Sequence, residues 1–144
     1  MGRPTLEFLQ ACEAVGRTVV IVSNNAEQAI DAYLERFHLH PYVHAVAAHT
    51  PGRPDLMKPH PDAIKRALDI LRVAPEVCCM VGDSVSDIIV CQATGVRSVG
   101  FAKNPKRGRE LADAGADAIV ESMTLLAGAI VESSSVYRAR STGV

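Results

Sequence analysis

Short apolar runs alternate with segments of helical period along this chain, and no other feature of the sequence constrains the fold as strongly. The segments between the runs repeat apolar residues every three or four positions, as one face of a helix does. Such alternation is typical of parallel strands joined by crossover helices. We therefore predict an α/β fold, a Rossmann-like parallel sheet of about five strands with helices on both faces. The predicted strands cover residues 18–22, 45–48, 77–81, 98–101 and 118–120.

Several helix ends are marked by residues that favour termination or capping. Gly16 and Gly115 each follow a helical segment, and glycine readily enters the left-handed conformation that ends many helices. Ser122 precedes the last segment and can cap its first turn. The predicted helices cover residues 6–15, 26–37, 64–71, 109–114 and about 123–132.

The length of 144 residues suits one domain, which we place at residues 1–132. Residues 133–144 are small, polar and partly basic without periodicity, so we predict a flexible tail there. Lys and Arg total 15 against 16 for Asp and Glu, which provides no basic surface for nucleic acid or an anionic membrane. Because no apolar stretch is long enough to span a bilayer and no leader pattern is present, we expect a soluble cytoplasmic protein.

The four cysteines form no C-x-x-C pair, so a metal or redox role is disfavoured. We interpret them as small buried apolar residues, which suits a reducing compartment. They are Cys12, Cys78, Cys79 and Cys91.

Polar residues follow the first predicted strand. In an open α/β sheet, ligands bind beyond the carboxyl ends of the strands, and Ser23, Asn24 and Asn25 lie at such an end. Their hydroxyl and amide groups, with the backbone N–H groups of a helix start, suit phosphoryl oxygens. The alternative interpretation is a simple helix cap.

An acidic turn, Gly82-Asp83-Ser84-Val85-Ser86-Asp87, follows the third predicted strand. Its two carboxylates are four residues apart and can converge on one hard cation. The alternative makes Asp83 an N-cap and Asp87 a solvated helix residue. The turn directly follows an uninterrupted apolar strand, which favours the metal site.

Lys58 lies in a proline-rich loop, within Met57-Lys58-Pro59-His60-Pro61. The flanking prolines restrict its backbone, and Pro61 suits the start of a helix that would hold the loop against the sheet. A lysine held there can neutralise a phosphoryl group, although an isolated surface lysine is the alternative. We leave the five histidines out of the site because none shows metal-ligand spacing with a carboxylate.

The order Ser23, Lys58 and Gly-Asp-Ser-x-x-Asp resembles the haloacid dehalogenase superfamily of hydrolases and phosphatases, in a phosphoglycolate-phosphatase-like arrangement. Further similar motifs are Val-Ser-Asn, Lys-Pro-x-Pro, Ala-x-Gly-Val and Glu-Leu-x-x-Ala-Gly-Ala-Asp. The resemblance implies that Ser23 and Lys58 act on the transferring phosphoryl group, with Asn24 beside it, and that Asp83 and Asp87 hold Mg²⁺. It also implies hydrolysis of a small phosphorylated substrate.

Relatives also carry an Asp-x-Asp pair on an earlier strand, whose first carboxylate attacks phosphorus, and many carry a cap after it. This sequence contains no Asp-x-Asp and shows no strand or cap of that kind. We therefore expect the central nucleophile strand to be missing between the first and third predicted strands, and this chain alone to be inactive. A sequence that starts later than those of the relatives would explain why this strand and its Asp-x-Asp pair are missing.

The absent strand also predicts association, because unpaired backbone groups in the middle of a sheet are costly. A homo-oligomer or a partner chain would supply the missing strand. The alternative function is a non-catalytic binding or assembly module derived from a phosphatase. A receiver domain ranks last because no acidic cluster surrounds Asp83, and a dehalogenase is not separated from a phosphatase by these motifs.

Overall fold

The computed structural model describes the backbone of residues 2–142 and the side chains of residues 4–132. Five strands lie close to the five apolar runs, and every paired strand is parallel to its neighbour. The predicted α/β class is therefore confirmed. The strands are β1 (Val20–Val22), β2 (Ala45–Ala47), β3 (Cys79–Gly82), β4 (Arg97–Phe101) and β5 (Ala118–Val120).

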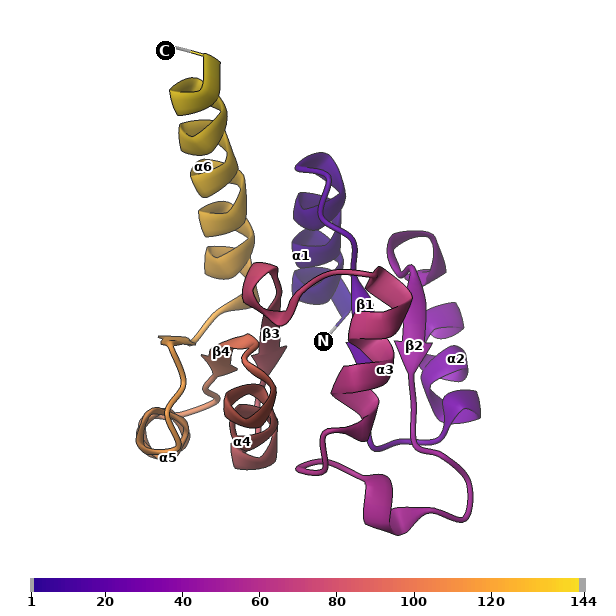
Figure 1. The fold of residues 1–144 in the computed structure, drawn as a ribbon. Coiled ribbons are helices and arrows are strands. Elements are labelled where there is room, and N and C mark those ends of the chain that lie inside the picture. The colour runs from indigo at the N-terminus through magenta and orange to yellow at the C-terminus, as the bar shows by residue number, and fades with distance from the viewer. Residues whose placement is uncertain (1, 143–144) are drawn as a thin grey trace.

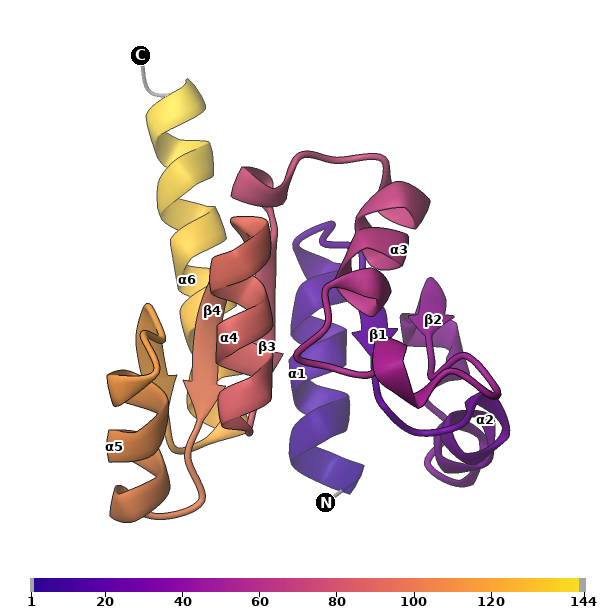
Figure 2. The ribbon, with the colours of Figure 1, turned by 60° about the horizontal axis from the view of Figure 1, so that its bottom comes forward.

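The strands form two separate sheets rather than one. One sheet has the order β1-β2, and the other has the order β3-β4-β5. In Figures 1 and 2 the strands of both sheets point the same way, and β1 and β3 lie on the sides of their sheets that face each other. Within the described residues, β1 and β3 each pair on one side only. This break lies where the resemblance to the haloacid dehalogenase superfamily leads us to expect a central strand.

Helices cover both sheets. Helix α3 lies in front of β1 and β2 in Figure 1, whereas α1 lies behind the break and packs along α6. Helix α3 also contacts α4, which covers β3 and β4. Helix pairs therefore span the break on both sides. The helices are α1 (Gly2–Ala14), α2 (Glu27–Arg36), α3 (Asp62–Leu71), α4 (Val85–Thr94), α5 (Pro105–Asp113) and α6 (Met123–Thr142), with short 3₁₀ helices η1 (His40–Tyr42), η2 (Pro54–Leu56) and η3 (Pro75–Val77).

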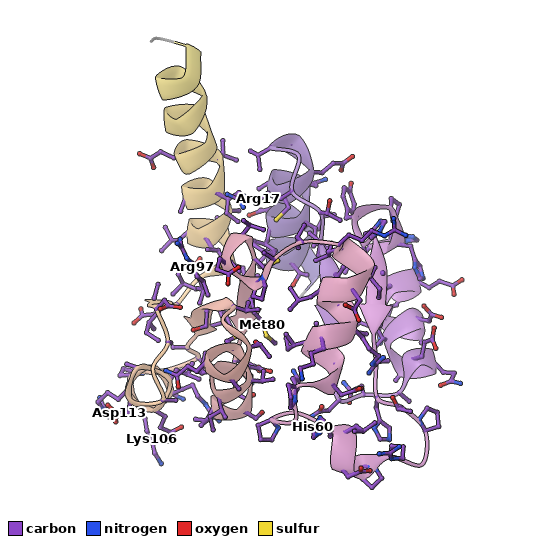
Figure 3. All side chains as sticks on the ribbon, in the orientation of Figure 1. Arg17, His60, Met80, Arg97, Lys106 and Asp113 are labelled. Carbon is purple, nitrogen blue, oxygen red and sulfur yellow. The ribbon has the colours of Figure 1, made fainter. Side chains whose placement is uncertain are left out.

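Two hydrophobic clusters hold these layers. The first joins α1, α2 and the end of β2 through Leu9, Ile30, Leu34, Leu39 and Ala48. The second joins α3 and α4 through Ile64, Val90, Cys91 and Val96. Val22 of β1 and Met80 of β3 pack against the second cluster, and Figure 3 shows Met80 between the two halves. The second cluster is therefore the apolar connection across the break.

The third predicted strand begins two residues later than expected. Residues 75–77 form η3 instead, where the Cys78 N–H donates to the Pro75 carbonyl at 3.0 Å and so closes a turn. Val77 is 70% exposed, and the Cys79 side chain is also exposed at the start of β3. The expectation that all four cysteines are buried is therefore wrong for Cys79, whereas Cys12 and Cys91 are buried.

Helix boundaries differ from the expected ones at two places. Helix α5 begins at Pro105, because the Asn104 side chain caps it by accepting the Arg107 N–H at 2.8 Å. The backbone of α6 continues to Thr142, beyond the expected end at residue 132, and residues 143–144 of the predicted tail lie outside the described residues. Gly16 and Gly115 have positive φ, as expected of helix ends. None of the described helices is both long and apolar enough to span a bilayer.

Candidate functional site

The carboxyl ends of β1 and β3 bring the predicted site residues to one edge of the molecule. Ser23 and Asn24 directly follow β1, and Asp83 directly follows β3, where α4 then begins. The loop that contains Lys58 reaches the same edge before α3 starts, as Figure 1 shows at the lower side of the view. Groups from both halves of the broken sheet therefore meet here.

Lys58 is the group that connects the two halves. Its ammonium contacts a carboxylate oxygen of Asp87, and it also lies 3.4 Å from the Val22 carbonyl oxygen at the end of β1. The side chains of Lys58 and Asp87 are only 9% and 6% exposed. The alternative of an isolated surface lysine is therefore wrong, because the structure holds this ammonium in a buried ion pair at the carboxyl edge.

Asn24 contacts the backbone of Lys58. Its Oδ1 accepts the Lys58 N–H at 2.7 Å, and its Nδ2 donates to the Lys58 carbonyl at 3.4 Å. The neighbouring Ser23 Oγ accepts the Asn25 N–H at 3.0 Å, and the Ser23 N–H donates to the Ala47 carbonyl at 3.1 Å. Ser23 is therefore fixed at the end of β1, and its hydroxyl hydrogen keeps the capacity to donate to a bound group.

Asp87 is held by a capping box at the start of α4. The Ser84 Oγ accepts the Asp87 N–H, and an Asp87 carboxylate oxygen accepts the Ser84 N–H, both at 3.3 Å. The carboxylate lies against Gly82, where an added Cβ would be 2.5 Å from the Asp87 Cβ. Only glycine at position 82 leaves room for this carboxylate. The alternative of a solvated helix residue is therefore wrong for Asp87.

Asp83 differs from Asp87, because its side chain is exposed and has no hydrogen bond or ion pair with another described residue. Ser84, not Asp83, caps α4. Within the described residues, no group of three or more His, Cys, Asp or Glu side chains is arranged to hold a metal. Asp83 and Asp87 both lie in the turn and first helical residues after β3, and one or two carboxylates with waters and phosphate oxygens suffice for Mg²⁺.

A nucleophilic role for the nearby thiol is disfavoured. The Cys91 Sγ lies 3.5 Å from the Met80 Sδ, and burial raises the pKa of this thiol to about 12. The thiolate is the reactive form, so Cys91 is inert at neutral pH.

His60 and His49 are the histidines that the structure places near this edge. His60 Nδ1 accepts the Asp62 N–H at 3.1 Å, at the first residue of α3. Figure 3 shows His60 in the loop at the lower edge. The His49 N–H donates to the Asn25 carbonyl at 3.0 Å, and its buried Nδ1 has no hydrogen-bond partner among the described residues.

Sequence reasoning missed three contributors to the site. These are the Val22 carbonyl, the Ser84 cap and Gly82, whose lack of a side chain leaves room for the Asp87 carboxylate. Ser84 was detectable, because Ser followed three residues later by an acidic residue at a helix start is a capping signal. The Val22 carbonyl had no signal, since it contacts a side chain 36 residues away.

Comparison with known proteins places this chain in a family. The model of the haloacid dehalogenase-like hydrolases matches residues 3–95, which is more than half of the chain. The chain belongs to the haloacid dehalogenase-like hydrolase family. This confirms the resemblance inferred from Ser23, Lys58 and the acidic turn.

Relatives in this family include phosphatase-type enzymes. The pyrophosphatase PpaX of Bacillus mycoides is 31% identical over 93 residues, which cover 65% of this chain and 42% of the relative. A predicted phosphatase from Clostridium acetobutylicum is 25% identical with a TM-score of 0.77, covering 90% of this chain and 59% of that one. A putative β-phosphoglucomutase from Thermotoga maritima, 20% identical with a TM-score of 0.79 and the same coverages, shares the fold. The matching region thus spans less than half of PpaX.

Proposed function

We propose that this chain carries the phosphate- and metal-binding part of a Mg²⁺-dependent phosphate-ester hydrolase of the haloacid dehalogenase-like family. The observation that carries the proposal is the buried Lys58 ammonium at the carboxyl edge, beside Ser23 and the acidic turn. Phosphoryl transfer requires mainly positioning and charge stabilisation, which a fixed ammonium and a hydroxyl donor supply. Its ligand is a small phosphorylated compound.

Mg²⁺ fits the donors at this edge through Asp83. This carboxylate is exposed and unpartnered within the described residues, whereas Asp87 is engaged by Lys58 and Ser84. Asp83 would bind the ion directly. Asp87 would be the second acidic residue that holds the ion. When bound, the ion would neutralise charge on phosphoryl oxygens. Lys58 would hold the phosphoryl group, and Ser23 would donate its hydroxyl hydrogen to it.

Binding of the metal and of inorganic phosphate tests this assignment. By titration calorimetry, Asp83→Asn is expected to abolish Mg²⁺ binding, and Lys58→Gln is expected to abolish phosphate binding. Matched controls are Asp113→Asn at the end of α5, which Figure 3 labels, and Lys65→Gln, an exposed lysine of α3. If the unaltered chain binds neither Mg²⁺ nor phosphate, the proposal fails.

Turnover by this chain alone is expected to be negligible. The sequence contains no Asp-x-Asp pair, so no carboxylate is available in the family's nucleophile position. The assay is hydrolysis of an aryl phosphate with and without Mg²⁺. Robust Mg²⁺-dependent hydrolysis that Asp83→Ala removes would contradict this expectation.

An extended segment from another copy or a partner chain is proposed to fill the break between β1 and β3. The unpaired sides of these two strands support this proposal, since buried backbone groups normally find partners. Light scattering at high concentration is expected to show association. A strictly monomeric chain in which all amides of β1 and β3 exchange slowly would argue against it.

The free cysteines suit a reducing cytoplasm.

A non-catalytic binding or assembly module is the second candidate. The observation that favours it is the full engagement of Asp87, whose two oxygens are bonded to Lys58 and Ser84 and so stabilise the fold without a metal. The hydrolase and the binding module predict different results when a strand with an Asp-x-Asp pair is added to the chain. Turnover that appears when an Asp-x-Asp strand is added favours the hydrolase, whereas binding without turnover favours the module.

A further inference from the structure

The Asn24 side chain and the Lys58 backbone form a reciprocal pair of hydrogen bonds. The Lys58 N–H donates to Asn24 Oδ1 at 2.7 Å, and Asn24 Nδ2 donates to the Lys58 carbonyl at 3.4 Å. The two residues are 34 positions apart, in the loop after β1 and in the loop before α3. One amide group thus holds both backbone polar groups of the lysine.

This pairing fixes the base of a long side chain. A lysine ammonium stands on a flexible four-carbon stem, so its position depends on where the backbone is held. Asn24 fixes the backbone end, while the Val22 carbonyl and Asp87 fix the ammonium end. The three contacts come from β1, the loop after it and α4, so Lys58 is held from both halves of the molecule.

We infer that Asn24 is a positioning residue for Lys58 and that it acts on bound phosphate through that lysine. This inference rests on the proposed role of Lys58 in holding a phosphoryl group. It differs from the expectation that Asn24 contacts phosphate directly: Lys58 engages Oδ1 and one hydrogen of Nδ2, and one Nδ2 hydrogen remains.

The choice of residue type follows from these contacts. A primary amide combines an acceptor with donors, so it can bond an N–H and a carbonyl of the same residue. A carboxylate at position 24 would still accept the Lys58 N–H but would face the Lys58 carbonyl with a second acceptor. Asn24→Asp therefore keeps half of the pairing, and Asn24→Ala keeps none.

The test observes the Lys58 ammonium directly. In protein labelled with ¹⁵N-lysine, the Lys58 resonance is assigned by its loss in Lys58→Gln, and inorganic phosphate is titrated in parallel. Asn24→Ala is expected to move the Lys58 resonance toward those of exposed lysines and to weaken phosphate binding about tenfold. Asn24→Asp is expected to give a smaller change of the resonance.

Two control variants separate positioning from general loss of stability. Gln28→Ala changes an exposed amide of α2, whose side chain takes no part in the pairing. Asn104→Ala removes the cap of α5, remote from Lys58, and lowers stability. Both are expected to leave the Lys58 resonance in place.

Two results would overturn the inference. If Asn24→Ala weakens phosphate binding while the Lys58 resonance stays unchanged, Asn24 is a direct ligand. If neither the resonance nor the affinity changes, the pairing has no positioning role. Should the unaltered chain bind no phosphate while Asn24→Ala still moves the resonance, the proposed function fails but the positioning of Lys58 stands.

Discussion

Gly82 shows how a single residue shapes the candidate site. It ends β3 directly against Asp87, and an added Cβ would lie 2.5 Å from the Asp87 Cβ and 2.6 Å from its Oδ2. The start of α4 and the carboxylate that pairs with Lys58 therefore depend on the absence of a side chain.

We expect Gly82→Ala to destabilise the chain by about 1 to 3 kcal/mol, because the Asp87 side chain and the first turn of α4 must shift. The measurement is urea denaturation followed by circular dichroism. Gly128→Ala is the matched control, since position 128 lies within α6 and a Cβ there meets no atom within 4 Å. The control is expected to be neutral or slightly stabilising, and equal losses for both variants would refute this view of Gly82.

Cys91 provides a test at alkaline pH. Burial raises its pKa from 9.0 to about 12, so the folded chain holds this proton more tightly than the unfolded chain does. The free energy of unfolding must therefore fall as the pH rises above 9. Cys91→Ala is expected to lower stability at neutral pH by leaving a cavity, but to flatten the alkaline decline. Urea midpoints measured from pH 7 to alkaline pH check this, and parallel curves for both proteins would contradict it.

At the scale of elements, the capping box of α4 does more than end a helix. Ser84 and Asp87 satisfy each other's backbone N–H groups, and the same Asp87 carboxylate receives the Lys58 ammonium. Local capping and the long-range ion pair thus share one side chain.

We expect Ser84→Ala to lower the free energy of unfolding by about 1 kcal/mol and to disturb the Lys58 ammonium resonance. Asn104→Ala, which removes the equivalent cap of α5, should cost a similar amount without affecting that resonance. Chemical denaturation and the ¹⁵N-lysine spectrum measure the two effects. A Ser84→Ala chain with an unchanged Lys58 signal would show that the cap and the ion pair are independent.

Sequence patterns predicted most elements because their signals are local. Residues 118–120 and the glycine ends at Gly16 and Gly115 match the structure, since apolar runs and left-handed caps depend on neighbouring residues alone. The start of α5 was missed although Asn104 and Pro105 form a clear capping signal. Val77 was misplaced because the turn at Pro75 overrides an apolar pattern that otherwise suits a strand.

The candidate site was only partly predictable for the same reason. Ser23, Lys58 and Asp87 were selected as candidates because they follow a predicted strand, lie in a proline-rich loop and belong to an acidic turn, respectively. Their pairing was not predicted, because the Lys58 contact with Asp87 joins residues 29 positions apart and depends on how the loop before α3 packs against the start of α4. The direction of the Asn24 side chain likewise depends on the fold.

At the scale of the whole molecule, the two sheets are connected by packed helices and by the apolar cluster of α3 and α4. Ile64 is buried in that cluster, against which Val22 of β1 and Met80 of β3 also pack.

We expect Ile64→Ala to cost about 2 to 5 kcal/mol and to raise amide exchange in both sheets, because its cluster contacts both. Leu34→Ala is the matched control, since Leu34 belongs to the cluster of α1, α2 and the end of β2. Its effect on exchange is expected to be larger in β1 and β2 than in β3, β4 and β5. Hydrogen exchange read by mass spectrometry makes the comparison, and identical patterns for the two variants would contradict a connecting role for Ile64.

The unpaired sides of β1 and β3 have a practical consequence for anyone who handles this protein. Strand edges with free N–H and carbonyl groups act as templates for other extended chains, and here two of them face each other. These unpaired strand edges are thus also a route to amyloid-like or amorphous aggregation. Solubility should therefore improve when a strand-forming peptide pairs with β1 or β3, and a screen of such peptides for soluble yield would measure this.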